Sequence, residues 1–262
     1  MPPLNDGINV IIKTYADRET GTEYLGEASR VLDLKHGRGI QVWDNGTIYK
    51  GYFKKGKMSG IGELHYRNGD VYEGEFKNDQ ASGQGILTSS DGTVYKGDWC
   101  LNKQDGFGVE TWPDGSRFEG YFVEGKKDGQ GIFTWADGSR YEGSFVRNEI
   151  QGYGKYVWPD GREYIGSWFN NKMDGKGTFI WPDKRRYEGE YVNDKKEGYG
   201  VFYWADGRIY KGFWRQGKQE GEGEIYYPKT KCFRKGKWLE GERISWDDEL
   251  DSETKAEENT AD

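Results

Sequence analysis

The chain has 262 residues, a net charge of −7 and a mean hydropathy of −1.01, with only 34% hydrophobic residues. So polar a composition would ordinarily indicate disorder, but disordered chains are poor in aromatic residues. Here 11 Trp, 19 Tyr and 12 Phe accompany 41 Gly. The composition therefore excludes a thick aliphatic core and indicates an ordered sheet built from rings and glycines.

The acidic charge is concentrated at the C-terminal end. Residues 241–262 hold nine acids and two bases, so the other 240 residues hold 36 acids (45 − 9) and 36 bases (38 − 2). This neutral body argues against nucleic-acid binding, which needs a basic surface to neutralise phosphates. Residues 247–262 are predicted to be an acidic, disordered tail.

Residues 1–23 form an N-terminal segment. They lack the basic start and the long apolar run of a signal peptide. Within them, residues 8–13, "INVIIK", are a candidate cap for the structure that follows. Cys100 and Cys232 lie far apart and match no metal-ligand spacing, so we expect a reduced, intracellular protein.

Nine repeats fill residues 24–232. Eight of them have a period of 23 residues, and each opens on an aromatic residue two positions before a glycine. A longer repeat precedes them and opens at Tyr24. Positions within a repeat are numbered here from the opening aromatic residue. The eight regular openings are Tyr49, Tyr72, Tyr95, Phe118, Tyr141, Tyr164, Tyr187 and Tyr210.

Each repeat carries turn signals and aromatic residues at fixed positions. In the eight regular repeats position 5 is aromatic, position 8 is Gly, Asn or Asp, positions 12 and 14 are Gly, and position 18 is aromatic in seven of the eight. Positions 20–21 mostly read Asn-Gly or Asp-Gly. This alternation predicts β-hairpins, with rings lying across the glycines of neighbouring strands. We expect residues 233–246, a half-repeat, to cap the C-terminal end.

The pattern Tyr-x-Gly-x-aromatic, then Gly-x-Gly, then Asp-Gly resembles the MORN repeat (membrane occupation and recognition nexus) over residues 24–245. The resemblance implies an all-β fold, an elongated single-layer antiparallel sheet of tandem 23-residue β-hairpins with a groove. It also implies non-enzymatic scaffolding in the radial-spoke heads of cilia, in the cytoskeleton or cell cortex, or at membrane junctions. Phospholipid binding is attributed to the family, but not uniformly.

Signs of an enzyme are few. His36 and His65 lie at different repeat positions, and neither has a neighbour in the sequence that suggests a metal or nucleophile site. No helical pattern follows any Gly-x-Gly, as a phosphate loop requires. Turn acids such as Asp160 and Asp183 are explained by hydrogen bonds to their own backbone. We expect no catalytic residue, no metal and no cofactor.

The aromatic positions are the candidate binding site. In one interpretation the rings are simply the core of the sheet. In the other they form a groove floor that accepts a partner's helix or extended segment, as exposed aromatic patches often do. The candidate residues are Trp112, Trp135, Trp158, Trp181, Trp204, Phe122, Phe145 and Trp168.

The sequence favours a scaffold or adaptor that binds other proteins, located in the cytoplasm, the cytoskeleton or a cilium. The alternatives are a phospholipid-binding membrane tether and a regulatory module that acts on an enzyme in trans. Lysines at the turns favour the tether, but acids accompany them, and the acidic tail opposes docking on an anionic membrane. The terminal repeats leave a homodimer open.

One turn departs from the repeat. Lys184 stands where six other repeats have glycine, and Arg185 and Arg186 follow it. These three cations are either tolerated drift on a solvated turn or a local contact for a partner or a lipid. If the turn keeps a positive φ, lysine costs about 1 kcal/mol relative to glycine.

Overall fold

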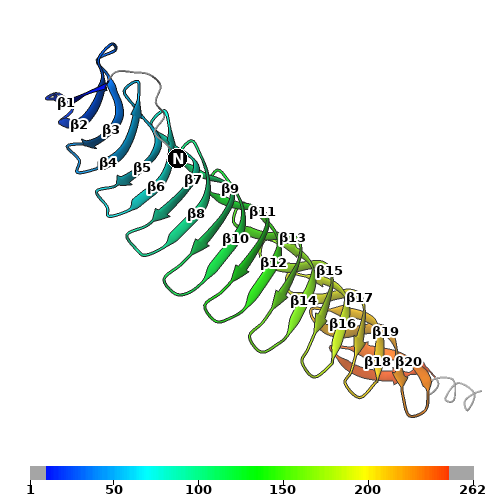
Figure 1. The fold of residues 1–262 in the computed structure, drawn as a ribbon. Helices are drawn as coiled ribbons and strands as arrows, with labels where there is room; N and C mark the ends of the chain where they lie inside the picture. Colours follow the sequence, from blue (N-terminus) through cyan, green and yellow to red (C-terminus); the bar gives the residue numbers. More distant parts are fainter. Residues whose placement is uncertain (1–9, 248–262) are drawn as a thin grey trace, which may run out of the picture. The chain divides into compact units, whose positions relative to one another are not determined.

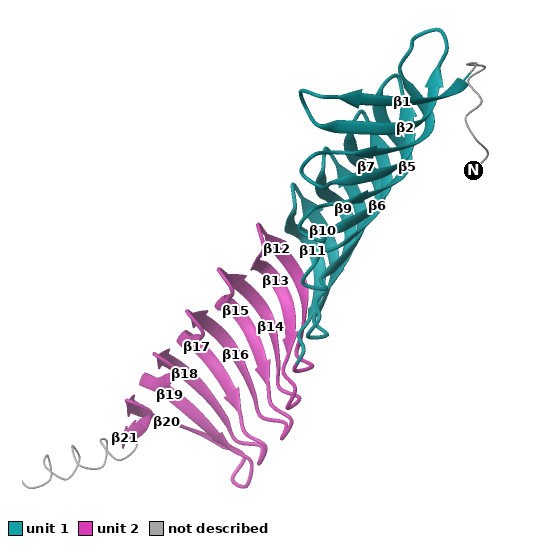
Figure 2. Ribbon diagram, turned by 90° about the vertical axis from the view of Figure 1, so that its left-hand side faces the viewer, with its two compact units in different colours: residues 1–136 teal, residues 137–262 magenta. Residues whose placement is uncertain are grey.

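The computed structural model describes residues 10–247, which form strands joined by tight turns (Figure 1). The chain divides into two compact units at residues 136 and 137 (Figure 2). Within each unit, every strand pairs antiparallel with the strand before it and the strand after it. The prediction of an all-β fold made of tandem antiparallel β-hairpins is therefore confirmed.

Among residues 10–247, eleven strands belong to unit 1 and ten to unit 2. The strands of unit 1 are β1 (Val10–Asp17), β2 (Thr22–Ser29), β3 (Lys35–Val42), β4 (Ile48–Lys54), β5 (Lys57–His65), β6 (Val71–Lys77), β7 (Gln80–Thr88), β8 (Val94–Cys100), β9 (Lys103–Thr111), β10 (Arg117–Val123) and β11 (Lys126–Thr134). Those of unit 2 are β12 (Arg140–Val146), β13 (Glu149–Val157), β14 (Glu163–Phe169), β15 (Lys172–Ile180), β16 (Arg186–Val192), β17 (Lys195–Tyr203), β18 (Ile209–Arg215), β19 (Lys218–Tyr227), β20 (Cys232–Leu239) and β21 (Glu242–Trp246).

The predicted packing of rings on glycines holds throughout. Tyr49, at position 1, lies over Gly51 and Gly62, at positions 3 and 14 of the same repeat, so that a Cβ atom on either glycine would overlap its ring. The two glycines are also direct partners across the β4–β5 pair. Position 1 is almost fully buried in every repeat. The glycines thus make room for the ring, and the ring covers their backbone.

The tyrosine hydroxyl at position 1 has a fixed partner. It donates a hydrogen bond to the carbonyl oxygen of position 4, at 2.6–3.2 Å between oxygens. A buried hydroxyl without a partner would cost free energy, so this bond explains why tyrosine tolerates the core. Phe118 is the single position-1 residue of the nine repeats that lacks the hydroxyl.

The rings of positions 1 and 5 form a continuous ladder within each unit. Within each unit, from Tyr49 on, the position-1 rings contact the position-5 ring of their own repeat and that of the next repeat edge to face, with centroids 4.9–5.6 Å apart. The first repeat has Ala28 at position 5, so Tyr24 contacts the Phe53 ring of the next repeat. This is the geometry that aromatic quadrupoles prefer. The ring ladder, defined as positions 1 and 5, is the core of each unit.

The first turn of each of the eight regular repeats uses two consecutive residues with positive φ, not one. Position 7 joins position 8 in this conformation, as in Asn170 (φ 48) and Asn171 (φ 63). Two such residues define a type I′ hairpin turn, whose twist matches that of the flanking strands. Position 8 also binds the preceding repeat, since the Asn171 amide donates to the Ile150 carbonyl and its side chain accepts from the Ile150 amide.

The glycine at position 12 has a different role from the one at position 14. It has positive φ in every repeat, for example 88° at Gly152, and lies where the strand register shifts. Such a shift is a β-bulge, which glycine permits because it lacks a Cβ atom. Gly154, at position 14, has ordinary extended backbone and packs under Tyr141.

Both ends of the described chain add a strand. β1 pairs with β2, so residues 10–13 of the candidate N-terminal cap belong to an end strand, while residues 1–9 lie outside the described residues. β21, the "ERISW" segment, pairs with β20. Of the predicted acidic tail, residues 248–262 also lie outside the described residues.

Candidate functional site

The structure separates the candidate site residues into two groups. Phe122, Phe145 and Trp168 occupy position 5 in the ring ladder and are only 2%, 3% and 6% exposed. The five tryptophans at position 18 are half-buried. The first group therefore forms core, whereas the second group retains surface that a partner can reach.

In unit 2 the position-16 and position-18 rings form one continuous row. Neighbouring rings in it are 4.4–5.7 Å apart between centroids. We call this set the tryptophan row. Its members are Tyr156, Trp158, Phe179, Trp181, Phe202 and Trp204. In unit 1, Trp112 and Trp135 contact Phe133 in the same way, at 5.4 and 4.5 Å.

Each tryptophan of the row is held by an arginine and an aspartate from its own turn. Arg185 Nε lies 2.7 Å from Asp183 Oδ2, and its guanidinium lies 5.5 Å from the centroid of Trp181. The equivalent arginines at Trp158 and Trp204 repeat this arrangement. The aspartate also accepts the Arg185 backbone amide, as the sequence analysis expected of the turn acids. Arg185 is therefore part of the repeated framework.

The three consecutive cations do not converge on one patch. Lys184 is exposed in the turn, with φ 73, and its amide donates to the Trp181 carbonyl as the sibling glycines do. Arg185 covers Trp181, whereas Arg186 lies over Tyr203 at 4.2 Å from the ring centroid. Lys184 therefore forms the same turn as the glycines at this position of the other repeats. Because its φ is positive, the steric cost of lysine relative to glycine applies here.

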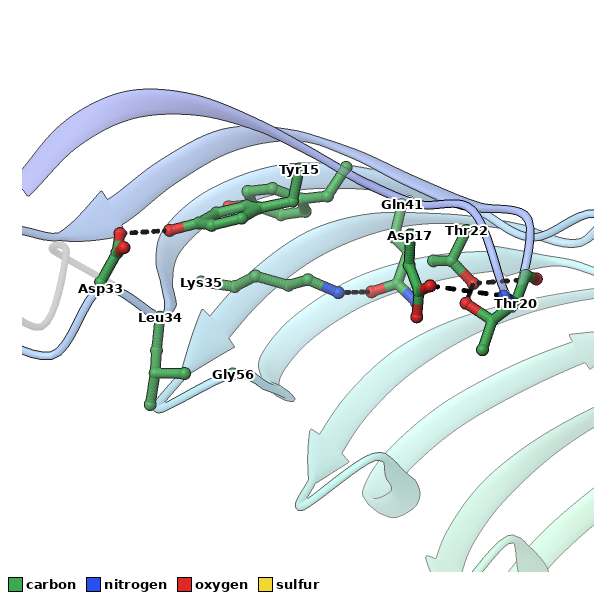
Figure 3. A pocket seen from close by; sticks show the side chains of 10 residues that line it. Tyr15, Asp17, Thr20, Thr22, Asp33, Leu34, Lys35, Gln41 and Gly56 are labelled. Carbon is green, nitrogen blue, oxygen red and sulfur yellow. Dashed lines mark hydrogen bonds between the residues drawn. The ribbon is translucent and has the colours of Figure 1, made fainter.

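Three lysines lie opposite a position-5 residue, among aromatic rings. Lys127 and Lys196 are at position 10, and Lys35 holds the equivalent place in the first repeat, which is two residues longer. The first is Lys35, whose ammonium donates to Gln41 Oε1 at 2.6 Å (Figure 3). The second is Lys127, whose ammonium lies 2.6 Å from Glu110 Oε2. The third, Lys196, lies 4.6–5.3 Å from four ring centroids. Sequence reasoning did not single out these lysines, although Lys127 and Lys196 share a repeat position.

Burial lowers the pKa of two of these lysines. It lowers the pKa of Lys35, and it lowers the pKa of Lys196 to about 8, with the charge of Arg185 adding to the second effect. Both shifts arise because a partly desolvated ammonium is less stable than one in water. Lys196 is therefore a cation held at a cost to folding.

The opposite face of the sheet carries exposed rings that the sequence analysis did not consider. Tyr199 and Phe213 are each 52% exposed and contact each other at 5.7 Å. Phe107 and Tyr121 form a similar pair at 5.5 Å. These rings occur as isolated pairs at positions 13 and 4, not as a row. The sequence carries a signal for these pairs, since aromatic residues recur at positions 4 and 13 in several repeats.

Residues 10–247 contain no group of three or more His, Cys, Asp or Glu side chains that could hold a metal ion. The same residues contain no helix long and apolar enough to span a membrane. Cys100 and Cys232 are exposed and unpaired with each other.

The tandem antiparallel hairpins, each with a buried aromatic ring over paired glycines, define a repeat protein built from β-hairpins. The chain belongs to the MORN repeat family. The family profile matches nine segments, residues 31–48, 49–71, 72–94, 95–117, 118–140, 141–161, 164–184, 187–207 and 210–230. The predicted family is thereby confirmed.

Solved structures of low identity also match. One is the TCP domain of SAS-4 from Drosophila melanogaster in complex with a proline-rich motif of Ana2, with 14% identity, 69% of this chain and 90% of that chain covered, and a TM-score of 0.38. Another is a mutant TCP10 domain of Danio rerio CPAP, with 18% identity, coverage of 79% and 97%, and a TM-score of 0.28. Comparison with curated proteins gives no significant match.

Proposed function

We propose that this protein is a non-enzymatic scaffold that binds partner proteins along the tryptophan row, within a ciliary or cytoskeletal assembly of the cytoplasm. The observation that carries the proposal is the row itself. In unit 2 six rings lie in continuous contact, and Trp158, Trp181 and Trp204 keep part of their surface exposed. Tryptophans of this kind are the residues that most often dominate protein interfaces.

The proposal includes the absence of catalysis, and the contacts of the turn aspartates support this part of it. Asp160, Asp183 and Asp206 each accept a backbone amide within their own turn, and each forms an ion pair with an arginine. Their environments are nearly identical, whereas acid–base catalysis needs carboxyls with differing environments. The ciliary or cytoskeletal location follows from the resemblance to the repeat family.

The lipid-tether alternative receives less support from the turn lysines. Lys103 lies 3.6 Å from Glu124, and Lys218 lies 2.8 Å from Glu240 in the following turn. These pairs reduce the positive charge available to an anionic membrane. A liposome sedimentation assay distinguishes the two functions, because strong, salt-sensitive binding to phosphoinositide vesicles would support the tether instead.

Affinity purification from the source cell tests the scaffold directly. The bait is the full chain, compared with a row variant carrying Trp158→Ala, Trp181→Ala and Trp204→Ala. The matched control carries Tyr199→Ala and Phe213→Ala on the opposite face. We expect axonemal or cortical proteins with the native chain and the control, and their loss with the row variant. Equal recovery with all three would contradict the proposal, and a captured enzyme whose rate changes on binding would favour the regulatory module.

Homodimerisation through the terminal repeats stays a prediction. Within the described residues, β1 pairs only with β2, and β21 pairs only with β20, so each end strand has one open edge. Such edges are templates for pairing with another chain. Light scattering on the purified protein tests this point, with a dimer mass expected and a monomer mass at all concentrations contradicting it.

A further inference from the structure

Lys196 is enclosed by rings but lacks an acceptor. Its ammonium has no hydrogen bond or ion pair with any residue in the range 10–247. Ring faces attract a cation, yet a partly desolvated ammonium still retains three unused donors. The distances from Nζ to the ring centroids are 4.6 Å to Trp214, 4.8 Å to Phe202, 5.0 Å to Tyr187 and 5.3 Å to Trp181.

Lys35 and Lys127 each have the side-chain acceptor that Lys196 lacks. Gln41 and Glu110 supply oxygens to Lys35 and Lys127. Glu110 is at position 16 of its repeat, and Gln41 holds the equivalent place in the longer first repeat, opposite Tyr24. Lys35 takes its acceptor from its own repeat, and Lys127 takes its acceptor from the preceding one. The two corresponding residues around Lys196 are phenylalanines. They are Phe202 in its own repeat and Phe179 in the preceding one.

A second polar group without a partner lies beside Lys196. Tyr191 is its direct partner across the β16–β17 pair and is 3% exposed. Its hydroxyl makes no hydrogen bond to any described residue. Every other regular repeat has Phe or Trp at this position.

We propose that the Lys196 ammonium, within its group of rings, is a carboxylate-binding site, and that it takes an Asp or Glu side chain from the chain's own acidic segment, residues 248–262. A carboxylate accepts hydrogen bonds without donating any, which suits an ammonium whose three donors are unused. Its single charge balances that of Lys196. Phosphate carries more charge than this one ammonium neutralises.

Charge and reach select the acidic segment as the occupant. Residues 248–262 hold seven acids and one lysine, a balance of −6 (1 − 7). From β17, which carries Lys196, to β21 there are four strand steps, about 19 Å. Fifteen residues extend to about 50 Å, so they span this distance with ease. Tethering also gives the segment an effective concentration on the order of millimolar.

Lysine acetylation measured by mass spectrometry tests the site in the full-length chain. The native chain is compared with a variant whose seven acids in residues 248–262 are changed to the corresponding amides. Both are treated with a small acetylating reagent at low salt and at 0.5 M NaCl. At low salt we expect Lys196 to react about 3-fold faster or more in the amide variant, because the occupying carboxylate is gone. Lys127 is the internal control, since Glu110 stays in place.

The possible outcomes separate the site from its occupant. Salt should abolish the difference at Lys196, because screening weakens the contact. A synthetic acidic peptide of residues 248–262, added to the amide variant at low salt, should restore protection of Lys196, whereas an amidated peptide should not. If only the added peptide protects, the carboxylate site stands and the chain's own segment is not its occupant. Equal reactivity under all conditions overturns the whole proposal.

Because Trp181 belongs to both this site and the tryptophan row, an engaged acidic segment would compete with a partner there. The inference does not depend on the proposed function, since acetylation reports on Lys196 without any partner. Failure of the acetylation test would leave the affinity purification unaffected, and the reverse also holds.

Discussion

The ring of Tyr164 lies over Gly177, and its hydroxyl and ring carbons fill the space that a Cβ atom at Gly177 would need. The same relationship recurs in each repeat, so the fold depends on small residues beneath large ones. Because each unit has only one layer of strands, this contact takes the place of a thick hydrophobic core. Four predictions follow from the contacts of single residues.

Gly177→Ala should destabilise the protein by about 2–3 kcal/mol, because the new methyl group overlaps the buried Tyr164 ring. The control is Gly115→Ala, where nothing lies within 4 Å of the new atom and only the positive φ of 88° opposes it. There we expect a loss of about 1 kcal/mol. Urea unfolding measures both, and equal losses would contradict the packing account.

Phe118→Tyr should stabilise the protein by about 0.5–1.5 kcal/mol. The added hydroxyl can donate to the Tyr121 carbonyl, as the tyrosines of the other repeats do at position 4. The reciprocal control is Tyr164→Phe, which removes the bond to Ser167 at 3.0 Å and should cost a similar amount. Thermal unfolding compares the two variants with the native chain. A destabilised Phe118→Tyr would show that this repeat has no room for the hydroxyl.

Lys184→Gly should stabilise the turn by about 1 kcal/mol, because glycine adopts the observed φ of 73° without steric cost. Lys184→Ala removes the same charge but keeps the steric cost, so it should change stability little. For a chain of this size the glycine variant should melt about 2–4 °C higher. If alanine stabilises as much as glycine, the effect comes from charge and not from φ. Partner capture by Lys184→Gly then tests the contact hypothesis separately.

The stability cost of Lys196 should depend on pH. Its pKa is about 8 in the folded chain and 10.5 in the unfolded chain, so between these values the unfolded state binds more protons. The native chain therefore gains stability as pH rises from 8 to 10.5. Lys196→Met, which copies Met58 and Met173 at position 10, should be more stable by about 1–3 kcal/mol at pH 7. That advantage should shrink across the same window.

The pH measurement is made by urea unfolding in 0.5 M NaCl, where any contact with the acidic segment is screened. Groups far from Lys196 contribute equally to the stability of both chains and cancel in the difference. Lys127→Met is the control, because this substitution also removes a lysine at position 10 but takes away the ion-pair partner of Glu110. A stability difference between Lys196→Met and the native chain that stays constant from pH 7 to 10.5 would contradict the assignment of the shift to Lys196.

The repeat made much of this fold predictable from the sequence. Tyr49, Gly51 and Gly62 recur at fixed spacing, and strand alternation then places the ring and both glycines on one face. The second positive φ of each turn was not predictable in this way. Leu101 and Arg147 adopt it at position 7, although neither residue type favours it. The geometry of the turn imposes the positive φ at position 7, so the residue types found there do not predict it.

The candidate site was less predictable than the fold. The aromatic residues Trp168 and Trp181 look alike in the sequence, but one lies in the ring ladder and the other in the tryptophan row. Their exposure depends on how successive repeats stack, which no single repeat encodes. Lys196 shows the same limit, because its missing acceptor becomes visible only when position 16 of two repeats is placed beside it.

Photo-crosslinking from the tryptophan row tests the central claim most directly. A benzophenone amino acid replaces Trp181 in one chain and Tyr199, on the opposite face, in another, and both chains are irradiated in the source cell. The account predicts a protein partner joined covalently at position 181 and none at position 199. Crosslinking only from position 199, or from neither position, would contradict binding along the tryptophan row.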